Sequence, residues 1–351
     1  MKFIFPIDGD VLTPADGRLE EGRLLVCVRI SAPAGARQVM INGRPAIKKG
    51  TFWALELAFE AGKTRLEATT GAERAEITVY RFPKADRKYR LAIDDIIWTL
   101  RDVAEKGYTS LFENPFFALF RGLYEEFGTK THLNIYYHDG AGFNLSMFPD
   151  RYRAEFEAAA AWMRLTFHAR CDQPDHIYRT APYEEIRRDF EQVTAEIRRF
   201  AGDRIWREPV NGLHFAETTR AGARALRDCG IRCLLGYYIF DRKGNPAVSY
   251  YLDRAQTEHA AGRDFWVDNS EGIIFSKDKL VLDAWPLAEI PAQLDALSPQ
   301  LAGTVNFVTH EQYFYPFYSH YQPDYPEKLR AAVRWATERG YEPCFLGDVL
   351  E

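Results

Sequence analysis

The residues best able to do chemistry in this chain are acids and histidines that follow short apolar runs. Two adjacent carboxylates, Asp94 and Asp95, end the run "RLAIDD". Three later apolar runs also end in ionisable groups, namely His168 after "RLTF", His214 after "NGL", and His310 with Glu311 after "VNFVT". Carboxylates and imidazoles bind divalent metal ions and transfer protons. Chance could place one or two such residues, so the pattern carries weight as a set.

Taken one at a time, these residues have simpler explanations. Asp94 or Asp95 could cap a following helix, because an aspartate side chain accepts hydrogen bonds from the first helical amides. Capping by one leaves the other unexplained, and two adjacent carboxylates repel each other unless a cation lies nearby or one is protonated. A histidine at a strand end is often an ordinary loop residue. As a group, however, the residues favour a metal site.

The elements that would position these residues alternate between strands and helices. Strands are predicted at 131–137, 165–169, 231–238 and 302–310, and helices at 112–128, 181–202 and 325–340. The helical segments repeat apolar residues with a period near 3.6. Such alternation over residues 88–351 favours an irregular parallel (β/α) barrel of about seven strands over an open sheet. Active sites of such barrels lie at the C-terminal ends of the strands, where the acids and histidines are expected.

Residues 240–285 are rich in turn-forming and aromatic residues, which predicts a β-hairpin insertion in the barrel. Its Tyr250, Tyr251 and Trp266 could line a sugar cleft, because aromatic faces stack on sugar rings. The alternative is that these rings pack the insertion onto the barrel. Trp98, just after the paired aspartates, is expected in a wall of the site. His320, in the aromatic segment "FYSHYQPDY", could add to a sugar platform.

The sequence of residues 1–85 has a different pattern, of short strand-like runs separated by turn signals, and predicts an all-β domain. "RLLVCVRIS" alternates, with Val26, Val28 and Ile30 on one face, and Asn42-Gly43 is a strong signal for a two-residue hairpin. Short strands at this spacing suggest a sandwich. The segment 39–68 resembles the immunoglobulin-like modules of bacterial surface and carbohydrate-active proteins. We expect a spacer or accessory role, with ligand binding as the alternative.

Bulk composition limits the partners and the setting. A chain of 351 residues with 46% hydrophobic residues can form two domains. The net charge of −5, with dispersed lysines and arginines, argues against nucleic acid. No apolar run approaches the ~20 residues of a membrane span. Five cysteines give no disulfide framework, so we expect a reducing, cytoplasmic setting, with export through a removed signal as the alternative. No obligate protein partner is evident.

Residues 88–351 resemble the polysaccharide deacetylase superfamily, the NodB-homology or carbohydrate esterase family 4 group, within the glycoside hydrolase/deacetylase barrels. "LAIDD" matches the family's first motif, a strand ending in two aspartates, and implies that Asp94 is the general base and Asp95 a metal ligand. "FHARCDQPDH" stands where the family has two histidines on one turn. His168 matches the first of these, but the position four residues on is Asp172.

The resemblance therefore leaves the third metal ligand open among His214, Asp172 and His176. His214 lies in "REPVNGLHFAET", a loose counterpart of the family's third motif. "VNFVTHE" matches the last motif, a strand ending in a histidine, and implies that His310 is the general acid, with Glu311 beside it as a further catalytic candidate.

Such a set is suited to removing an acyl group, such as N- or O-acetyl, from a saccharide. A divalent metal, with zinc as the ion expected, lowers the pKa of a water molecule and polarises the carbonyl. A neighbouring carboxylate takes the proton, and an opposing histidine donates one to the leaving group. The same residues leave two other functions open. A glycoside hydrolase would need two carboxylates about 5–10 Å apart, with Asp94 and Glu311 as the pair. A catalytically inactive barrel would bind carbohydrate without turnover.

Overall fold

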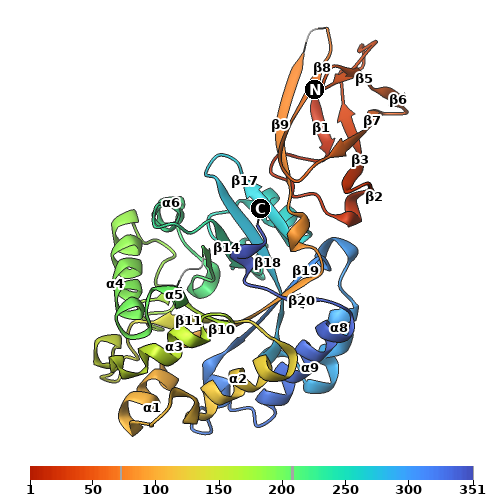
Figure 1. Ribbon diagram of the computed structural model, residues 1–351. Coiled ribbons are helices and arrows are strands. Elements are labelled where there is room, and N and C mark those ends of the chain that lie inside the picture. The colour runs from red at the N-terminus through yellow and green to blue at the C-terminus, as the bar shows by residue number, and fades with distance from the viewer. Residues whose placement is uncertain (72, 207–208, 351) are drawn as a thin grey trace.

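The computed structural model describes residues 1–71, 73–206 and 209–350. The first part of the chain forms two antiparallel sheets. One contains β1 (Lys2–Phe5), β2 (Arg18–Glu20), β3 (Arg23–Ser31), β6 (Ile47–Lys49) and β7 (Phe52–Phe59). The other contains β4 (Met40–Ile41), β5 (Arg44–Pro45), β8 (Gly62–Thr69) and β9 (Arg74–Arg81). These sheets form the upper part of the molecule in Figure 1.

The local patterns of this part are confirmed. Val26, Val28 and Ile30 of β3 are fully buried in the core, and the residues between them face outward. Asn42 and Gly43 connect β4 to β5, each with a positive φ, as a two-residue hairpin turn requires. The more specific immunoglobulin-like topology and the boundary at residue 85 stay predictions.

The rest of the chain forms a nearly closed barrel of seven parallel strands, as the alternation predicted. Around the barrel the strands run β12 (Met163–Ala169), β11 (Thr131–Tyr136), β10 (Lys88–Ile96), β19 (Thr304–His310), β18 (Ile273–Val281), β14 (Cys233–Gly236) and β13 (Val210–Asn211). Barrel strands that follow one another in the chain pair with each other, except β12 and β13, which lie at the two ends of this order. Between β13 and β12, the Asn211 side chain donates a hydrogen bond to the carbonyl of Phe167.

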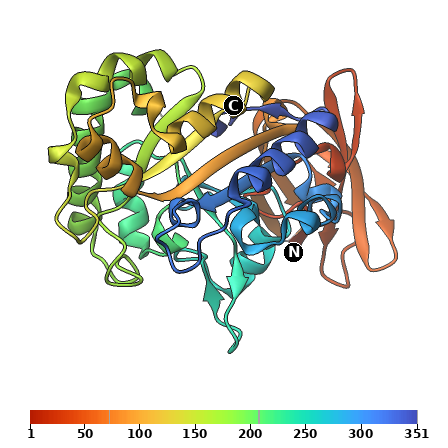
Figure 2. The same ribbon diagram turned by 90° about the horizontal axis from the view of Figure 1, so that it is seen from below.

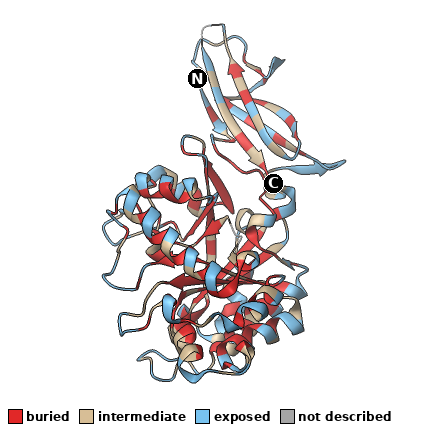
Figure 3. Ribbon diagram, turned by 60° about the vertical axis from the view of Figure 1, so that its left-hand side comes forward, coloured by how far each residue is buried: buried red, intermediate tan, exposed pale blue. Residues whose placement is uncertain are grey.

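Helices cover the outside of the barrel and present their exposed faces to solvent, while the strands between them are buried (Figure 3). They are α1 (Trp98–Lys106), α2 (Pro115–Phe127), α3 (Arg153–Ala159), α4 (Tyr183–Ala201), α5 (Asp203–Trp206), α6 (Arg220–Asp228), α7 (Arg254–Ala261), α8 (Ile290–Asp295) and α9 (Tyr325–Glu338). Asn114 caps α2, accepting from two amides, and Gly128 ends it in a left-handed conformation. Among the described helices, none is both long and apolar enough to cross a membrane.

The predicted insertion at 240–285 is too long. Only its first part leaves the barrel, as the projecting hairpin of β15 (Ile239–Phe240) and β16 (Pro246–Ala247) seen in Figure 2. Its last part contains β18, a barrel strand with parallel partners on both sides. The sequence of β18, "IIFSKDKLV", contains polar residues and therefore resembles a surface turn. In the barrel these polar side chains are accommodated by the interior, including the buried Ser276 and Asp278.

The two antiparallel sheets attach to the barrel at the end opposite to the strand C-termini. The contact is made through β17 (Phe265–Asp268), which pairs with the first half of β18. Asp10 is fully buried there, and its Oδ1 lies 2.6 Å from His259 Nε2 and 3.3 Å from Arg263 Nε. Trp266 donates from Nε1 to the carbonyl of Asp8 at 2.9 Å. The prediction that Trp266 lines a sugar cleft therefore gives way to a role in packing the two parts together.

Candidate metal centre and cavity

A break in the regular pairing of β10 brings both aspartates to the same cavity. Neighbouring residues of a regular strand point to opposite faces. The register between β10 and β11 shifts between Ile93 and Ile96, and Asp95 has a φ of +66°. This bulge turns Asp95 so that it lines the cavity together with Asp94. A left-handed conformation at a non-glycine residue is strained, and such strain concentrates at functional sites.

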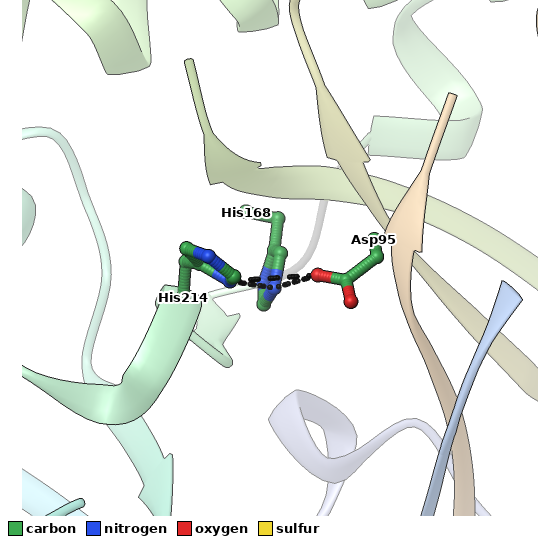
Figure 4. A group of neighbouring side chains, drawn as sticks. All are labelled: Asp95, His168 and His214. Atoms are coloured by element: carbon green, nitrogen blue, oxygen red, sulfur yellow. Dashed lines mark hydrogen bonds and ion pairs between the residues drawn. The ribbon is translucent and has the colours of Figure 1, made fainter. Parts of the chain in front are cut away.

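Asp95, His168 and His214 form a buried cluster (Figure 4). Asp95 Oδ1 lies 3.1 Å from His168 Nε2 and 3.4 Å from His214 Nδ1, and these two nitrogens are 3.3 Å apart. One ligand atom from each residue lies within 4.8 Å of the other two. The cluster draws on β10, β12 and the turn at His214–Ala216, which follows β13. Of the three candidates for the third ligand, His214 is the one that belongs to this cluster.

Neighbouring groups orient these side chains as a metal site requires. His168 Nδ1 lies 2.5 Å from the carbonyl of Gly212, and a carbonyl oxygen only accepts, so Nδ1 carries the proton. Nε2 faces Asp95 Oδ1 at 3.1 Å, and it is the nitrogen that would bind a metal ion. Gln312 donates from Nε2 to Asp95 Oδ2 at 2.9 Å. One carboxylate and two imidazoles, with outer partners holding Asp95 and His168, fit a divalent ion.

Charges in the cluster favour an ionised Asp95. Burial by itself raises the pKa of this carboxyl group, but hydrogen bonds with His168 and His214 outweigh burial and hold the pKa well below its usual range. Tyr136, which sequence reasoning missed, contacts two members of the cluster. Its hydroxyl donates to Asp95 Oδ1 and lies 2.9 Å from His214 Nδ1. Burial and the Asp95 charge keep the Tyr136 pKa well above normal, so the hydroxyl stays protonated.

Asp94 stands beside the cluster and is held by an amide. The Asn134 side chain donates to Asp94 Oδ1, and Thr166 donates to Asn134 Oδ1 at 2.6 Å, which fixes the orientation of that amide. Both supporting residues are buried on β11 and β12. In the strand pairing, Asp94 is the partner of His310.

His310 faces the same cavity from β19 and forms an ion pair with Asp283. Its Nδ1 lies 3.1 Å from Asp283 Oδ1, and that oxygen also accepts from the His310 amide at 3.0 Å and from Thr309 Oγ1 at 2.7 Å. Burial lowers the pKa of His310, but Asp283, with smaller effects from Asp95 and Asp94, raises it to about 10. The imidazole is therefore protonated at neutral pH. Sequence reasoning missed Asp283, which follows β18 in the segment interpreted as an insertion.

Glu311 does not face the cavity, which corrects its prediction as a catalytic residue. It is fully buried beneath the start of α1. Its carboxylate accepts from the amides of Ile97, Trp98 and Thr99 at 2.7–2.8 Å. Glu311 thus supplies the helix cap that the sequence had suggested for Asp94 or Asp95, and both aspartates are left to the site.

A Glu311→Ala variant is expected to be strongly destabilised. It would leave three buried amides at the start of α1 without an acceptor, at a cost of about 2–4 kcal/mol in the free energy of unfolding. Urea denaturation would measure this loss. Glu113→Ala is the matched control, because Glu113 is exposed and, among the residues that the structure describes, accepts from a single amide, that of Thr109, at 3.0 Å. Equal stability of the two variants would contradict the capping role.

The two alternate ligands lie farther from the cluster. Asp172 is 56% exposed, and its Oδ1 is 3.7 Å from His214 Nε2, at the edge of the cavity. His176 pairs with Glu217, Nδ1 to Oε2, at 2.9 Å. Neither belongs to the group of donor atoms around Asp95.

The cavity around these residues has a volume of about 460 Å³. Trp98, Tyr313 and Tyr318 form part of its wall. Tyr250 and Tyr251 do not line it. The Tyr250 hydroxyl donates to the carbonyl of Leu235, and that of Tyr251 donates to Asp268. Packing onto the barrel, the alternative interpretation of these rings, is what the structure shows.

Two further polar residues that sequence reasoning missed, Tyr237 and Asp278, line the cavity. Burial is the main cause that raises the pKa of Asp278 to about 7, and the charge of Asp94 adds to it. Tyr237 and Asp278 come together because β14 pairs with β18. Their position in the cavity could therefore not be predicted from neighbouring residues in the sequence.

No protein family matches the chain, and no curated protein matches it. Among solved structures, a 4-alpha-glucanotransferase from Thermococcus litoralis has a TM-score of 0.45 at 11% identity, over 73% of this chain and only 38% of that protein. A protein assigned as a polysaccharide deacetylase from Mycobacterium smegmatis has a TM-score of 0.39 at 12% identity, covering 72% and 83% of the two chains. A peptidoglycan N-acetylglucosamine deacetylase has a TM-score of 0.39 at 12% identity, covering 76% and 90%. These TM-scores lie below 0.5, and none of these likenesses assigns a function to this chain.

Proposed function

We propose that this chain is a metal-dependent hydrolase that removes an acyl group, such as N- or O-acetyl, from a saccharide. The observation that carries the proposal is the buried Asp95, His168 and His214 cluster, with a separate carboxylate and a protonated histidine in the same cavity. These are the parts that amide or ester hydrolysis needs. Zinc is the ion we expect, because structural and catalytic zinc sites use imidazole and carboxylate ligands.

When bound, a divalent ion at this cluster would polarise the acyl carbonyl and lower the pKa of a water molecule. Asp94 is the neighbouring carboxylate that accepts the proton of the attacking water. The side-chain amide of Asn134 donates a hydrogen bond to Asp94 Oδ1. This contact orients the carboxylate and brings no positive charge that would neutralise it. The Tyr136 hydroxyl and the Gln312 amide keep Asp95 oriented toward the cluster.

The leaving amine or hydroxyl needs a proton when its bond to the acyl carbon breaks. His310 is protonated at neutral pH because it pairs with Asp283, and it lies across the strand pair from Asp94. Proton acceptance and proton donation are thereby assigned to two groups with opposite charge, each held by its own buried partner. This division of roles is the usual one in general acid–base catalysis.

A saccharide substrate is supported by the cavity itself. Its volume of about 460 Å³ lies within the range of roughly 300–1,000 Å³ found for small-molecule sites. The aromatic rings of Trp98, Tyr313 and Tyr318 line the cavity together with its polar groups. Such a surface matches a sugar ring, which has apolar C–H faces and hydroxyl edges. A reducing, cytoplasmic setting and an accessory role for the N-terminal sheets belong to the same proposal.

The pair of carboxylates expected for the glycoside hydrolase alternative, Asp94 and Glu311, does not form, because Glu311 caps α1 and does not face the cavity. The catalytically inactive barrel predicts sugar binding without turnover, and one experiment separates it from the proposal. Purified protein would be loaded with zinc, dialysed and analysed for bound metal, and then incubated with acetylated mono- and oligosaccharides while released acetate is measured. We expect one ion per chain and acetate release. A protein that retains no ion, or one that binds the sugars but releases no acetate, would overturn the proposal.

A further inference from the structure

Two polar residues that line the cavity, Tyr237 and Asp278, have no role in the proposed reaction. Asp278 belongs to β18, and Tyr237 follows the last residue of β14. In the parallel pairing of these strands Gly236 is the partner of Lys277, so the residue after each of them brings Tyr237 next to Asp278. We call these two residues the inner pair.

The inner pair lies at a different level of the barrel from the acid and base of the proposed reaction. Asp278 is the strand partner of Asn306 on β19, whereas Asp94 is the partner of His310, four residues farther toward the C-terminal end of β19. At about 3.3 Å per residue, these levels are roughly 13 Å apart along the strand. The cavity therefore extends from the strand ends into the barrel as far as Asp278.

The polar atoms of the inner pair are buried without a partner. Among the residues that the structure describes, neither the Tyr237 hydroxyl nor Asp278 Oδ1 has a hydrogen-bond partner. Buried polar groups are nearly always hydrogen-bonded. The neighbouring Tyr238 shows the usual arrangement, because its hydroxyl lies 3.1 Å from the carbonyl oxygen of Leu234 and 3.0 Å from that of Ser276. Two orphaned polar atoms in the lining of one cavity point to a polar ligand group between them.

The chemistry of the inner pair matches a hydroxyl group. The hydroxyl of Tyr237 both donates and accepts hydrogen bonds. Burial, opposed by the charge of Arg90 and aided by that of Asp94, raises the pKa of Asp278 to about 7, so a neutral carboxyl group that also donates and accepts is present near neutral pH. A sugar hydroxyl has the same two capacities. The methyl of an acetyl group has neither and would leave both buried atoms unpaired.

We propose that Tyr237 and Asp278 are specificity-determining residues that bind one hydroxyl group of the acylated sugar unit. The inference rests on the proposed function. An acetyl group whose carbonyl lies at the Asp95 cluster ends one bond beyond the carbonyl carbon, whereas the hydroxyl groups of a sugar are spread around its ring. The ring is therefore the part of the substrate that reaches the inner pair. A site built to bond a hydroxyl group discriminates against sugars that lack it.

Tyr237→Phe tests the proposal, with Tyr238→Phe as the matched control. The substrates are N-acetylglucosamine and its monodeoxy analogues, each of which lacks a different hydroxyl group. We expect Tyr237→Phe to keep the wild-type melting temperature and to lower kcat/KM for N-acetylglucosamine roughly tenfold. On the one analogue that lacks the recognised hydroxyl, the variant should match the wild type. Tyr238→Phe should melt at a lower temperature, because its hydroxyl contacts backbone carbonyls, and should keep the wild-type order of substrates.

Asp278→Leu, which keeps the approximate shape of the side chain and removes its polar atoms, should lose activity on the same substrates as Tyr237→Phe. Equal losses on N-acetylglucosamine and on every monodeoxy analogue, or wild-type kcat/KM for all of them in Tyr237→Phe, would overturn the inference while acetate release upheld the proposed function.

A binding measurement separates this inference from the proposed reaction. Isothermal titration of the zinc-loaded protein with N-acetylglucosamine measures sugar binding without turnover. If no protein releases acetate but Tyr237→Phe and Asp278→Leu bind this sugar more weakly than Tyr238→Phe and the wild type, the proposed reaction fails and the inner pair stands. Wild-type protein that binds neither N-acetylglucosamine nor any monodeoxy analogue would overturn the inference.

Discussion

An Asp95→Ala variant is expected to lose the bound divalent ion and the hydrolytic activity together. Asp95 supplies the only negative charge among the three ligand side chains, and its Oδ1 is within 3.4 Å of a nitrogen of each histidine. Two imidazoles remain in the variant, which is too few for a site that keeps an ion through dialysis. We expect metal content to fall to background and kcat/KM to fall on the order of a thousandfold.

Asp94→Asn is the matched control, because it changes the adjacent carboxylate and no ligand atom. This variant is expected to keep its ion while losing activity by roughly 10²–10⁴-fold, the contribution usual for a general base. Elemental analysis, acetate release and thermal melting of both variants would distinguish loss of metal from loss of folding. A folded Asp95→Ala protein that still holds one ion per chain would place the metal elsewhere. Full activity in Asp94→Asn would remove this carboxylate from the reaction.

The parts of the site that could be predicted from the sequence are those that a few neighbouring residues determine. Asp94, Asp95, His168 and His310 stand at strand ends, and parallel strands bring their C-terminal ends to one face of a barrel whatever the details of packing. The ends of helix α2 are also determined by neighbouring residues, because Asn114 and Gly128 cap them. Such features can be recognised from a few consecutive residues.

The remainder depends on contacts between distant segments. Glu311 follows His310 in the chain, but a turn places its carboxylate under α1, more than 200 residues away in sequence. Asp283 and Tyr136 reach the site only through the pairing of strands. The barrel strand β18 was taken for part of an insertion because polar residues that face a barrel interior resemble those of a surface turn. No pattern of types and spacing contains this information.

The same nonlocal contact between Asp283 and His310 gives a prediction in which pH is the variable. His310 must be protonated to donate a proton, so its contribution is present below its pKa and is lost as pH rises through that value. Asp283 is the main group that raises the pKa of His310 to about 10. Asp94 and Asp95 also raise it, but a bound cation would offset their charge, and Tyr313, whose ring centroid is 6.2 Å away, is neutral. Removing the Asp283 charge should therefore lower the pKa of His310 toward the ordinary value of about 6.5.

Asp283→Asn is expected to move the alkaline limb of the kcat/KM profile to lower pH, so that the loss of activity grows between neutral and alkaline pH. His310→Gln, which cannot donate as an acid, should lose roughly 10²–10⁴-fold at every pH. Thr309→Val is the matched control, because it removes the 2.7 Å hydrogen bond to Asp283 Oδ1 but keeps the carboxylate charge, and its alkaline limb should stay near that of the wild type. If Asp283→Asn retains the wild-type alkaline limb while His310→Gln is inactive, His310 does not act through its pairing with Asp283. If His310→Gln is fully active, the acid must be sought among the other groups that line the cavity.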